Sequence, residues 1–523
     1  MRTDERGAAG ANEADVPARG LAARGAYVWP LALAIVVLCA IAAHVSRIAD
    51  LPMGFYPDES SIGWNAWSIA TTGRDEHGTA WPLYFRAFGE YKNPFYIYFL
   101  ALVYKALGFS EWTTRFASVL CWLAGSAVLA ALAWRVFEER SVRLYVLVCL
   151  AFTPWLFALS RISFEVISVY PLIALHLYAI RRVLEKPSIT WAIVAGCAIG
   201  LAAYAYSALR LLAPLYVIAV LLCTFDRRRW RELLAFACAA ALTALPLAVY
   251  LATHAANLAA RFDILTYLHD PALTFGAKTQ FFIARYLEYF APSFLALSGD
   301  PNLRHHTGFG GELLLATTAL LAVGIVWALA ARDARRDPFA RLLIADLALS
   351  PIAAALTLDH AHSLRAFSLV VFAILLSAYG LRWIARRFGA VVAGTLTAAA
   401  ALQAVLYLHD YFVAYPAVSA RAFENYGFKE ALARAASIAQ DRIVVDSADN
   451  QPYISARFFG ALMPEKARVP IVVGDLKSLA PGDVLIFADP RFEHRDLREG
   501  LPAQSLYAIA RYDEAKRDLG APY

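Results

Sequence analysis

The chain has 523 residues, of which 60% are hydrophobic, 13% are aromatic and only 17% are charged, with a formal net charge of +6. A soluble chain averages about 45–50% apolar and about 25% charged residues, and a single hydrophobic core stops growing at about 250–300 residues. The composition therefore excludes an ordinary soluble enzyme, a disordered chain and a secreted disulfide scaffold. It indicates a polytopic membrane protein.

Apolar runs long enough for a bilayer-spanning helix, which takes about 17–25 residues, occur eleven times. They begin near Tyr27, Trp112, Arg143, Val166, Ile189, Ala208, Leu233, Leu313, Leu342, Phe367 and Val391. A twelfth apolar run, Pro94–Leu107, is shorter and opens on aromatic side chains. We expect this run to form an interfacial or re-entrant helix rather than a span.

The short loops between these runs differ sharply in charge. Arg161, Arg210 and Arg365 are the only Lys or Arg residues of the short outer loops. Seventeen Lys and Arg residues occur in the five other short loops, at residues 135–143, 181–187, 226–232, 332–341 and 382–387. Because cytoplasmic loops carry the excess of positive charge, this pattern predicts eleven spans with the N-terminus in the cytoplasm and the C-terminus outside.

The chain then divides into three parts: a cytoplasmic tail (residues 1–26), a transmembrane domain (27–408) and a C-terminal domain (409–523). Two long outer loops, residues 50–111 and 254–312, lie on the same side as the C-terminal domain. The C-terminal part has a soluble composition, and its β-branched runs are separated by helical patterns. The runs lie at residues 442–445, 469–473 and 484–487. We expect a small periplasmic α/β domain there.

The first outer loop carries an acidic pair, Asp58 and Glu59, soon after the first span. One interpretation is a solvated helix start with Asp58 as N-cap. The other is a binding surface, because the loop is long and dense in aromatic residues, glycine and proline. A second acid, Glu165, lies four residues after Arg161 in the next outer turn. The two side chains either pair across one helical turn or face a cavity.

Cations also occur in the later outer loops. Arg304 precedes the adjacent His305 and His306, and His362 and Arg365 lie between two later spans. Adjacent histidines are a poor chelating pair, so the sequence does not support a divalent metal site, and we expect no cofactor. We expect these loops to contact a phosphate or a sugar instead. Carboxylates and cations on one membrane face suit a lipid-linked phosphate, since Lys or Arg neutralise the phosphate while a carboxylate accepts a proton.

Several sequence pieces in this order resemble the bacterial GT-C-fold glycosyltransferases, relatives of the protein O-mannosyltransferases and the lipid A aminoarabinose transferase. The resemblance spans about residues 26–426. The pieces are the Asp58-Glu59 pair, residues 72–75 leading to Pro82, the run of residues 92–98, and residues 110–112 followed by Arg115.

The resemblance implies that Asp58 acts as general base on the acceptor hydroxyl, that Glu59 supports it, and that Glu165 is a second catalytic acid. It also implies that Lys92 contacts the lipid phosphate, although Lys92 stands two residues before Pro94 and the family's lysine stands one before. The donor phosphate and substrate are expected to contact Lys92, Arg161, Arg304, His305, His362 and Arg365.

The implied function is an inverting transfer of a sugar from a polyprenyl-phosphate donor to an acceptor hydroxyl at the periplasmic face of the inner membrane. The acceptor is a protein, a lipid or a glycan, and no nucleic acid partner is expected. No glycine-rich phosphate loop opens a helix, which argues against a nucleotide-sugar site. The alternative is a transporter or flippase of a lipid-linked saccharide, although no inverted repeat is visible. A membrane assembly factor is a further alternative.

Overall fold

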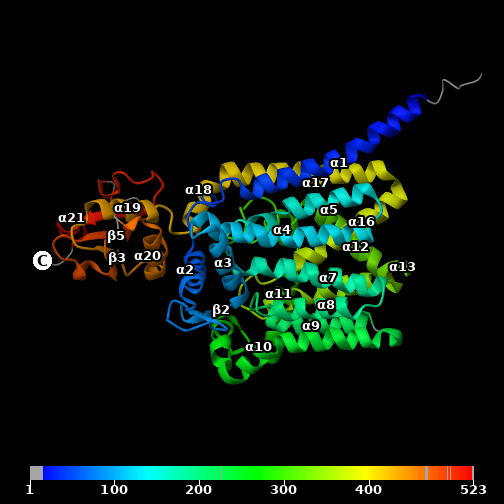
Figure 1. The fold of residues 1–523 in the computed structure, drawn as a ribbon, viewed down its shortest axis with the longest axis horizontal. Helices are drawn as coiled ribbons and strands as arrows, with labels where there is room; N and C mark the ends of the chain where they lie inside the picture. Colours follow the sequence, from blue (N-terminus) through cyan, green and yellow to red (C-terminus); the bar gives the residue numbers. More distant parts are fainter. Residues whose placement is uncertain are drawn as a thin grey trace, which may run out of the picture.

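The computed structural model describes residues 16–520 apart from residues 225, 466–468, 490, 492 and 495. Residues 1–15 of the predicted tail lie outside the described residues, and Val16 already belongs to the first helix, α1 (Val16–Val45). Long helices lie side by side in one bundle, and a small unit of helices and strands sits at one end of that bundle (Figure 1).

The bundle is built from helices that coincide with all eleven expected spans. They are α1, α4 (Glu111–Val136), α5 (Arg140–Phe152) with α6 (Pro154–Ser160), α7 (Val169–Glu185), α8 (Ile189–Ala202), α9 (Leu209–Cys223), α10 (Trp230–Leu265), α12 (Leu315–Ala330), α14 (Pro338–Leu349), α16 (Leu369–Phe388) and α17 (Ala390–His409). Among the described residues, six helical segments are long and apolar enough to cross a membrane, or seven if the pair α5–α6, bent by 43°, counts as one span. The remaining apolar helices are shorter, so the number eleven stays a prediction.

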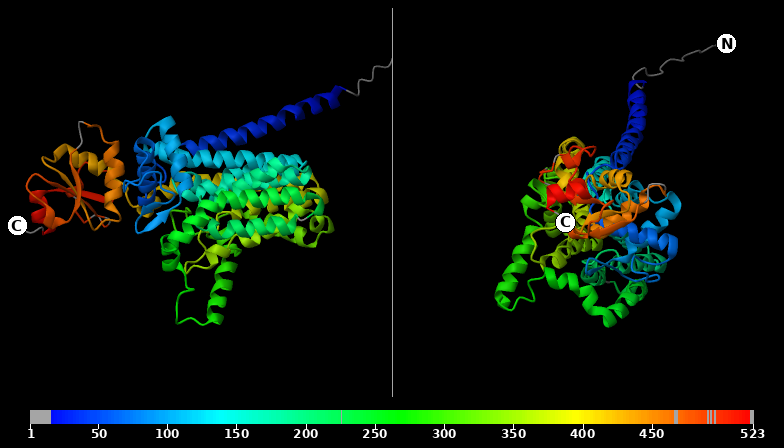
Figure 2. Two further views of the ribbon diagram at one scale, coloured as in Figure 1. Left: turned by 60° about the horizontal axis from the view of Figure 1, so that its bottom comes forward. Right: turned by 90° about the vertical axis from the view of Figure 1, so that its left-hand side faces the viewer.

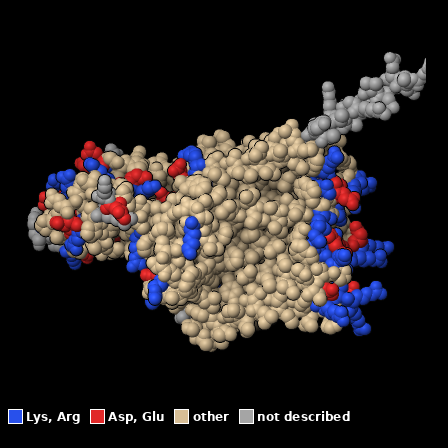
Figure 3. Space-filling model, viewed as in Figure 1, with Lys and Arg blue, Asp and Glu red and all other residues tan. Residues whose placement is uncertain are grey.

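Charged side chains gather at the two ends of the molecule. The space-filling view shows them at the free end of the bundle and over the end that carries the α/β unit, with a nearly uncharged face between (Figure 3). Large apolar side chains of the bundle helices, such as Leu222, Leu242 and Val391, are more than two-thirds exposed. A lipid-facing surface needs no polar cover, so this distribution is that of a membrane protein.

The first outer loop folds into two helices and a hairpin at the end of the bundle (Figure 1). Helix α2 (Pro57–Thr72) begins with Pro57, which fits the first turn because an N–H there has no partner within the helix. The helix is ended by Gly73, whose φ of 69° lies in the left-handed region. Strands β1 (Phe85–Ala87) and β2 (Glu90–Lys92) pair antiparallel. Helix α3 (Pro94–Leu107) has the bounds expected from the short apolar run.

The second long outer loop extends the bundle sideways. Helix α10 continues past a non-helical His254, and α11 (Phe275–Glu288) follows it in the lower part of the molecule (Figures 1 and 2). The chain then returns through η4 (Ser293–Leu297) to α12. In the segment between η4 and α12, Arg304 lies over the ring of Tyr56, so this segment contacts the start of the first loop.

The C-terminal unit is a four-stranded sheet with helices around it. Its elements are α18 (Tyr415–Ala422), α19 (Phe428–Ile438), β3 (Ile443–Asp446), α20 (Pro452–Leu462), β4 (Ile471–Gly474), β5 (Val484–Ala488), β6 (Tyr507–Arg511) and α21 (Tyr512–Leu519). The strand order is β4-β3-β5-β6, with β6 antiparallel to β5 and the other pairs parallel. The three expected strand runs correspond to β3, β4 and β5, whereas β6 was not expected.

Helix α20 packs the C-terminal unit directly against α2. The ring of Phe458 stacks on Phe55 with centroids 4.8 Å apart, and it lies so close to Gly63 that a Cβ atom there would stand 2.6 Å from it. Arg457 on α20 also pairs with Glu76 of the first loop at 3.3 Å. The C-terminal unit therefore supports the helix that carries Asp58.

Candidate active site

A cavity of about 500 Å³ opens where the first loop, the start of α7, the start of α9 and the two later outer loops meet. This volume is in the range of cavities that bind small molecules. Seven of the nine site residues predicted from the sequence line it: Asp58, Lys92, Glu165, Arg304, His305, His362 and Arg365. Glu59 and Arg161 do not.

Asp58 presents its carboxylate from the first turn of α2, where free backbone N–H groups favour negative charge. Its side chain is 34% exposed, and it forms an ion pair with Lys92, whose side chain is only 7% exposed. Burial by itself would lower the pKa of Lys92, but the carboxylates of Asp58, Glu165 and Glu90 outweigh it and raise that pKa. Lys92 therefore stays cationic beside a carboxylate that solvent and substrate can reach.

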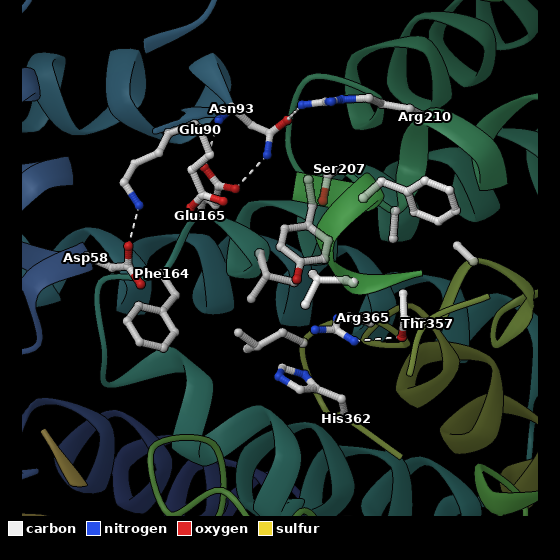
Figure 4. A pocket seen from close by; sticks show the side chains of 18 of the residues that line it. Asp58, Glu90, Asn93, Phe164, Glu165, Ser207, Arg210, Thr357, His362 and Arg365 are labelled. Carbon is white, nitrogen blue, oxygen red and sulfur yellow. Dashed lines mark hydrogen bonds and ion pairs between the residues drawn. The ribbon is translucent and has the colours of Figure 1, made fainter. Parts of the chain in front are cut away.

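Glu165 binds the residue next to Lys92. Its two carboxylate oxygens accept hydrogen bonds from the backbone N–H of Asn93 at 2.9 Å and from Asn93 Nδ2 at 2.5 Å. The side-chain oxygen of Asn93 in turn accepts a hydrogen bond from Arg210 at 2.8 Å. Figure 4 shows this chain along one wall of the cavity, with Asp58 next to it. Glu165 thus fixes the Lys92–Asn93 segment and, through Asn93, the head group of Arg210.

Two arginines come from the later loops. Arg304 lies over the ring of Tyr56 at 4.1 Å and pairs with Glu424 at 3.8 Å. Arg365 donates a hydrogen bond to Thr357 Oγ1 at 2.6 Å and forms an ion pair with Asp359. In Figure 4, Arg365 and His362 lie across the cavity from Asn93 and Arg210. Guanidinium groups are the preferred partners of phosphate oxygens, so the cavity is suited to an anionic ligand.

A cluster of acids and histidines lies beside the cavity, and two of its members, His305 and His362, line it. Asp300 Oδ2 accepts hydrogen bonds from His305 Nδ1 at 3.1 Å and from the backbone N–H of Ser363 at 2.8 Å. Burial opposes its charge, but His305, His362 and Ser363 together hold the pKa of Asp300 well below its usual value. Burial and then the charge of Asp300 raise the pKa of Glu312 to about 8, and burial lowers the pKa of His362 to about 3.

Glu59 and Arg161 have positions that differ from those expected. The buried Glu59 accepts hydrogen bonds from Arg115 at 2.9 and 3.0 Å and from the backbone N–H of Ser163 at 2.9 Å. Glu59 thus supports Asp58 only through the placement of α2, and it is not in contact with the cavity. Arg161, which was expected to contact the donor, does not line the cavity.

Arg161 is buried, and its guanidinium donates to the carbonyl oxygens of Ala43, His44 and Ser46 at 2.6–2.8 Å. Ala43 and His44 lie in the last turn of α1, whose final carbonyls have no partner within the helix, and Ser46 follows that helix directly. Arg161 therefore satisfies carbonyl oxygens at the C-terminal end of α1. Nor does Arg161 pair with Glu165, whose carboxylate is bound by Asn93.

Sequence reasoning missed other residues that line the cavity. Glu90, Asn93, Arg210, Ser207 and Thr357 are among them. The sequence did offer a reason to consider Arg210, because it is one of only three cations in the short outer loops, together with Arg161 and Arg365. It offered no reason to consider Asn93, since the position of this residue in the site depends on its contacts with Glu165 and Arg210.

Part of the chain matches a known protein family. Residues 91–252 match the protein family described as dolichyl-phosphate-mannose-protein mannosyltransferase. This segment contains Lys92, Asn93, Glu165 and Arg210. No curated protein matches the chain in sequence.

Among solved structures, the crystal structure of ArnT from Cupriavidus metallidurans bound to undecaprenyl phosphate superposes with a TM-score of 0.58. The two chains are 12% identical over 91% of this chain and 97% of that one, so they share a fold. The archaeal oligosaccharyltransferase AglB from Archaeoglobus fulgidus, in complex with an inhibitory peptide and a dolichol-phosphate, gives a TM-score of 0.48 at 13% identity, over 89% of this chain and 70% of that one. The resemblance to GT-C-fold glycosyltransferases expected from the sequence is confirmed.

Proposed function

We propose that this protein is an inverting glycosyltransferase that moves a sugar from a polyprenyl-phosphate donor to an acceptor hydroxyl, with Asp58 as general base. One observation carries the proposal: a single cavity joins the accessible carboxylate of Asp58 to Lys92, Arg210, Arg304 and Arg365. A base and a set of phosphate-binding cations are the two requirements of this reaction.

The reaction needs one displacement. The acceptor oxygen attacks the anomeric carbon of the donor sugar and forms the new glycosidic bond while its proton passes to Asp58. The bond between that carbon and the phosphate oxygen breaks, and the electron pair leaves with the polyprenyl phosphate. One displacement inverts the anomeric configuration, whereas a retaining mechanism needs a nucleophilic carboxylate and two steps.

Each polar residue of the cavity then has a defined task. Lys92 holds Asp58 before the donor binds and meets the phosphate as negative charge develops there. Arg210, held by Asn93 and Glu165, and Arg365 bind the other phosphate oxygens. Glu165 acts through this positioning and does not transfer a proton to the sugar.

The apolar part of the cavity receives the lipid. Leu211, Phe262, Leu265 and Leu356 line it beside the cations. A polyprenyl chain is a hydrocarbon, and its first isoprene units gain free energy from contact with such a surface. The family matched by residues 91–252 is named for a lipid-phosphate-linked sugar, which also supports a donor of this class.

The orientation follows from charge. The C-terminal unit lies at one end of the bundle, and so do α2 and β2, which carry Asp58 and Lys92 of the cavity (Figure 1). Lysine and arginine side chains also gather at the opposite end (Figure 3). The positive-inside rule puts the arginine-rich end in the cytoplasm, so the cavity faces the periplasm from the inner membrane. The acceptor is a protein, a lipid or a glycan that reaches this face.

The experiment is transfer of a labelled sugar from polyprenyl phosphate by purified protein in lipid nanodiscs. Asp58→Asn should lower the rate of transfer about 100-fold or more, the usual effect of losing a general base. Asp50→Asn is the matched control, because Asp50 is an exposed acid of the same loop outside the cavity. Wild-type rates in Asp58→Asn would remove Asp58 from the mechanism. Movement of the intact lipid-linked sugar across the bilayer without transfer would favour the transporter.

A further inference from the structure

The hairpin that ends in Lys92 turns through Phe88 and Gly89. Ala87 pairs with Glu90 across the last rung of the hairpin, so the turn consists of these two residues alone. Both have a positive φ, 57° at Phe88 and 77° at Gly89, which is the pattern of a type I′ turn. Asn-Gly is favoured in this turn, whereas a bulky side chain at positive φ costs free energy. Phe88 is therefore unfavourable for the turn itself, and a benefit has to come from its side chain.

The side chain of Phe88 contacts a cation of the cavity. The ammonium group of Lys92 lies 5.0 Å from the centroid of the Phe88 ring. A cation within about 6 Å of a ring centroid is attracted to the ring, and the attraction is stronger where water is excluded. The side chain of Lys92 is only 7% exposed, and it forms an ion pair with Asp58. The ring of Phe88 thus helps to hold the ammonium group beside Asp58.

The ring of Phe88 is itself held by the C-terminal unit. Tyr453 of α20 meets it nearly edge to face, with centroids 6.4 Å apart, a favourable arrangement of two aromatic rings. The guanidinium of Arg457 lies over the ring of Tyr453 at 5.5 Å, and Arg457 also pairs with Glu76 at 3.3 Å. Neither Phe88 nor Tyr453 lines the cavity. Helix α20 therefore reaches Lys92 through one intervening ring.

The C-terminal unit also contacts a second cation of the cavity. Glu424, between α18 and α19, pairs with Arg304 at 3.8 Å. Its other carboxylate oxygen accepts a hydrogen bond from Asn450 Nδ2 at 2.7 Å. Lys92 and Arg304 thus each have a partner in the C-terminal unit, through the ring of Phe88 in the first case and directly in the second.

We propose that Phe88 and Tyr453 are positioning residues for Lys92, and that through them the C-terminal unit is part of the donor site. A lysine side chain is flexible, and ordering it when a ligand binds costs conformational entropy. The ring of Phe88 orders the ammonium group before the donor arrives, and Tyr453 orders the ring. The inference rests on the proposed function, in which Lys92 contacts the phosphate of the donor.

The test is the binding of polyprenyl phosphate to the full-length protein in nanodiscs, measured by calorimetry. Phe88→Asn should raise the dissociation constant about fivefold or more, the effect of losing one cation–π contact with a buried ammonium group. Because asparagine suits the turn better than phenylalanine, this variant should unfold at about the wild-type temperature, which separates the loss of binding from misfolding. Phe88→Tyr keeps the ring and should bind as the wild type does.

Variants of Tyr453 test the contribution of the C-terminal unit. Tyr453→Leu should raise the dissociation constant about twofold or more, since it removes one aromatic pair, and Tyr453→Phe should bind as the wild type does. Tyr512→Leu is the matched control, because Tyr512 contacts the ammonium group of Lys516 at 4.3 Å in the same unit and does not line the cavity. Equal binding by Tyr453→Leu and the wild type would overturn the role of Tyr453.

Lys92→Ala distinguishes this inference from the proposed function. Combined with Lys92→Ala, Phe88→Asn should have no further effect on binding, because the ring acts through the ammonium group. A wild type that does not bind polyprenyl phosphate, or Lys92→Ala with wild-type affinity, would refute the assignment of Lys92 to the donor and this inference with it. Weak binding by Lys92→Ala together with wild-type binding by Phe88→Asn, or an equal loss from Phe88→Asn with and without Lys92, would overturn this inference alone.

Discussion

Replacement of Glu59 by glutamine tests how the helix that carries Asp58 is held. Each oxygen of the buried Glu59 carboxylate accepts two N–H groups: one oxygen from Arg115 Nε and Ser163, the other from Arg115 Nη2 and Tyr56, all at 2.9–3.2 Å. In Glu59→Gln one of these oxygens becomes an amide NH₂ group, which then faces two N–H donors and can accept from neither. The guanidinium of Arg115 also loses the negative charge with which it pairs.

The size of the effect follows from these contacts. Breaking a buried ion pair by removing one partner costs about 3–5 kcal/mol. Arg115 keeps the carbonyl oxygens of Pro52 at 2.9 Å and Gly54 at 2.6 Å as acceptors, which places the cost near the lower end. We therefore expect Glu59→Gln to lower the free energy of unfolding by about 3 kcal/mol.

The assay is unfolding of the purified protein in mixed micelles with increasing denaturing detergent. Glu111→Gln is the control, because Glu111 pairs with Lys429, whose side chain is 55% exposed, and such pairs contribute less than about 1 kcal/mol. The transfer rate per folded molecule should stay within about threefold of the wild-type rate, an effect of less than about 1 kcal/mol on the barrier. Stability unchanged by Glu59→Gln, or a catalytic loss at full stability, would refute the positioning role.

The remaining predictions concern the donor, the interface between α2 and α20, and the C-terminal unit. Lys92→Ala should lower kcat/KM for the donor about tenfold or more and leave the KM for the acceptor nearly unchanged, because a charge-assisted contact with the phosphate is lost; an effect on the acceptor alone would contradict this. Gly63→Ala should cost about 1–3 kcal/mol, since the new Cβ meets Phe458 at 2.6 Å, and should expose α20 to limited proteolysis. Burial, and then the charges of neighbouring acids, raise the pKa of Asp449 from 3.8 to about 7, so the folded state loses stability as pH rises between these values. Asp449→Asn should therefore gain on the order of 2 kcal/mol at pH 8, allowing for partial solvent exposure, and nothing near pH 4, as measured by thermal unfolding at both pH values.

The bundle was largely predictable because hydropathy and loop charge act over whole segments. The bounds of the helix Pro94–Leu107 can be read from the sequence, because proline is favoured at the first position of a helix and Gly108 follows its last residue. The helix start at Asp58 was predictable for a related reason, since an acidic residue before an apolar helical pattern is a local signal. The ion pair between Asp58 and Lys92 was not predictable, because Lys92 stands 34 positions later in the sequence, at the end of the β1–β2 hairpin.

The errors and omissions arise where partners are far apart in the sequence. Arg161 was misassigned because its partners are backbone carbonyls at the end of α1, which no residue type reveals. Asn93 and Arg210 join Glu165 only after three segments fold together. Likewise, His305 was considered together with its neighbour His306, whereas in the structure its ring lies against that of His362, on another loop.

The most direct test of the central claim is to follow both products when the purified wild-type protein is given a polyprenyl-phosphate sugar of defined anomeric configuration. We predict one polyprenyl phosphate released for each sugar transferred, with the opposite anomeric configuration in the product. Transfer with retained configuration, or a donor that stays intact in the presence of every class of acceptor, would contradict the account.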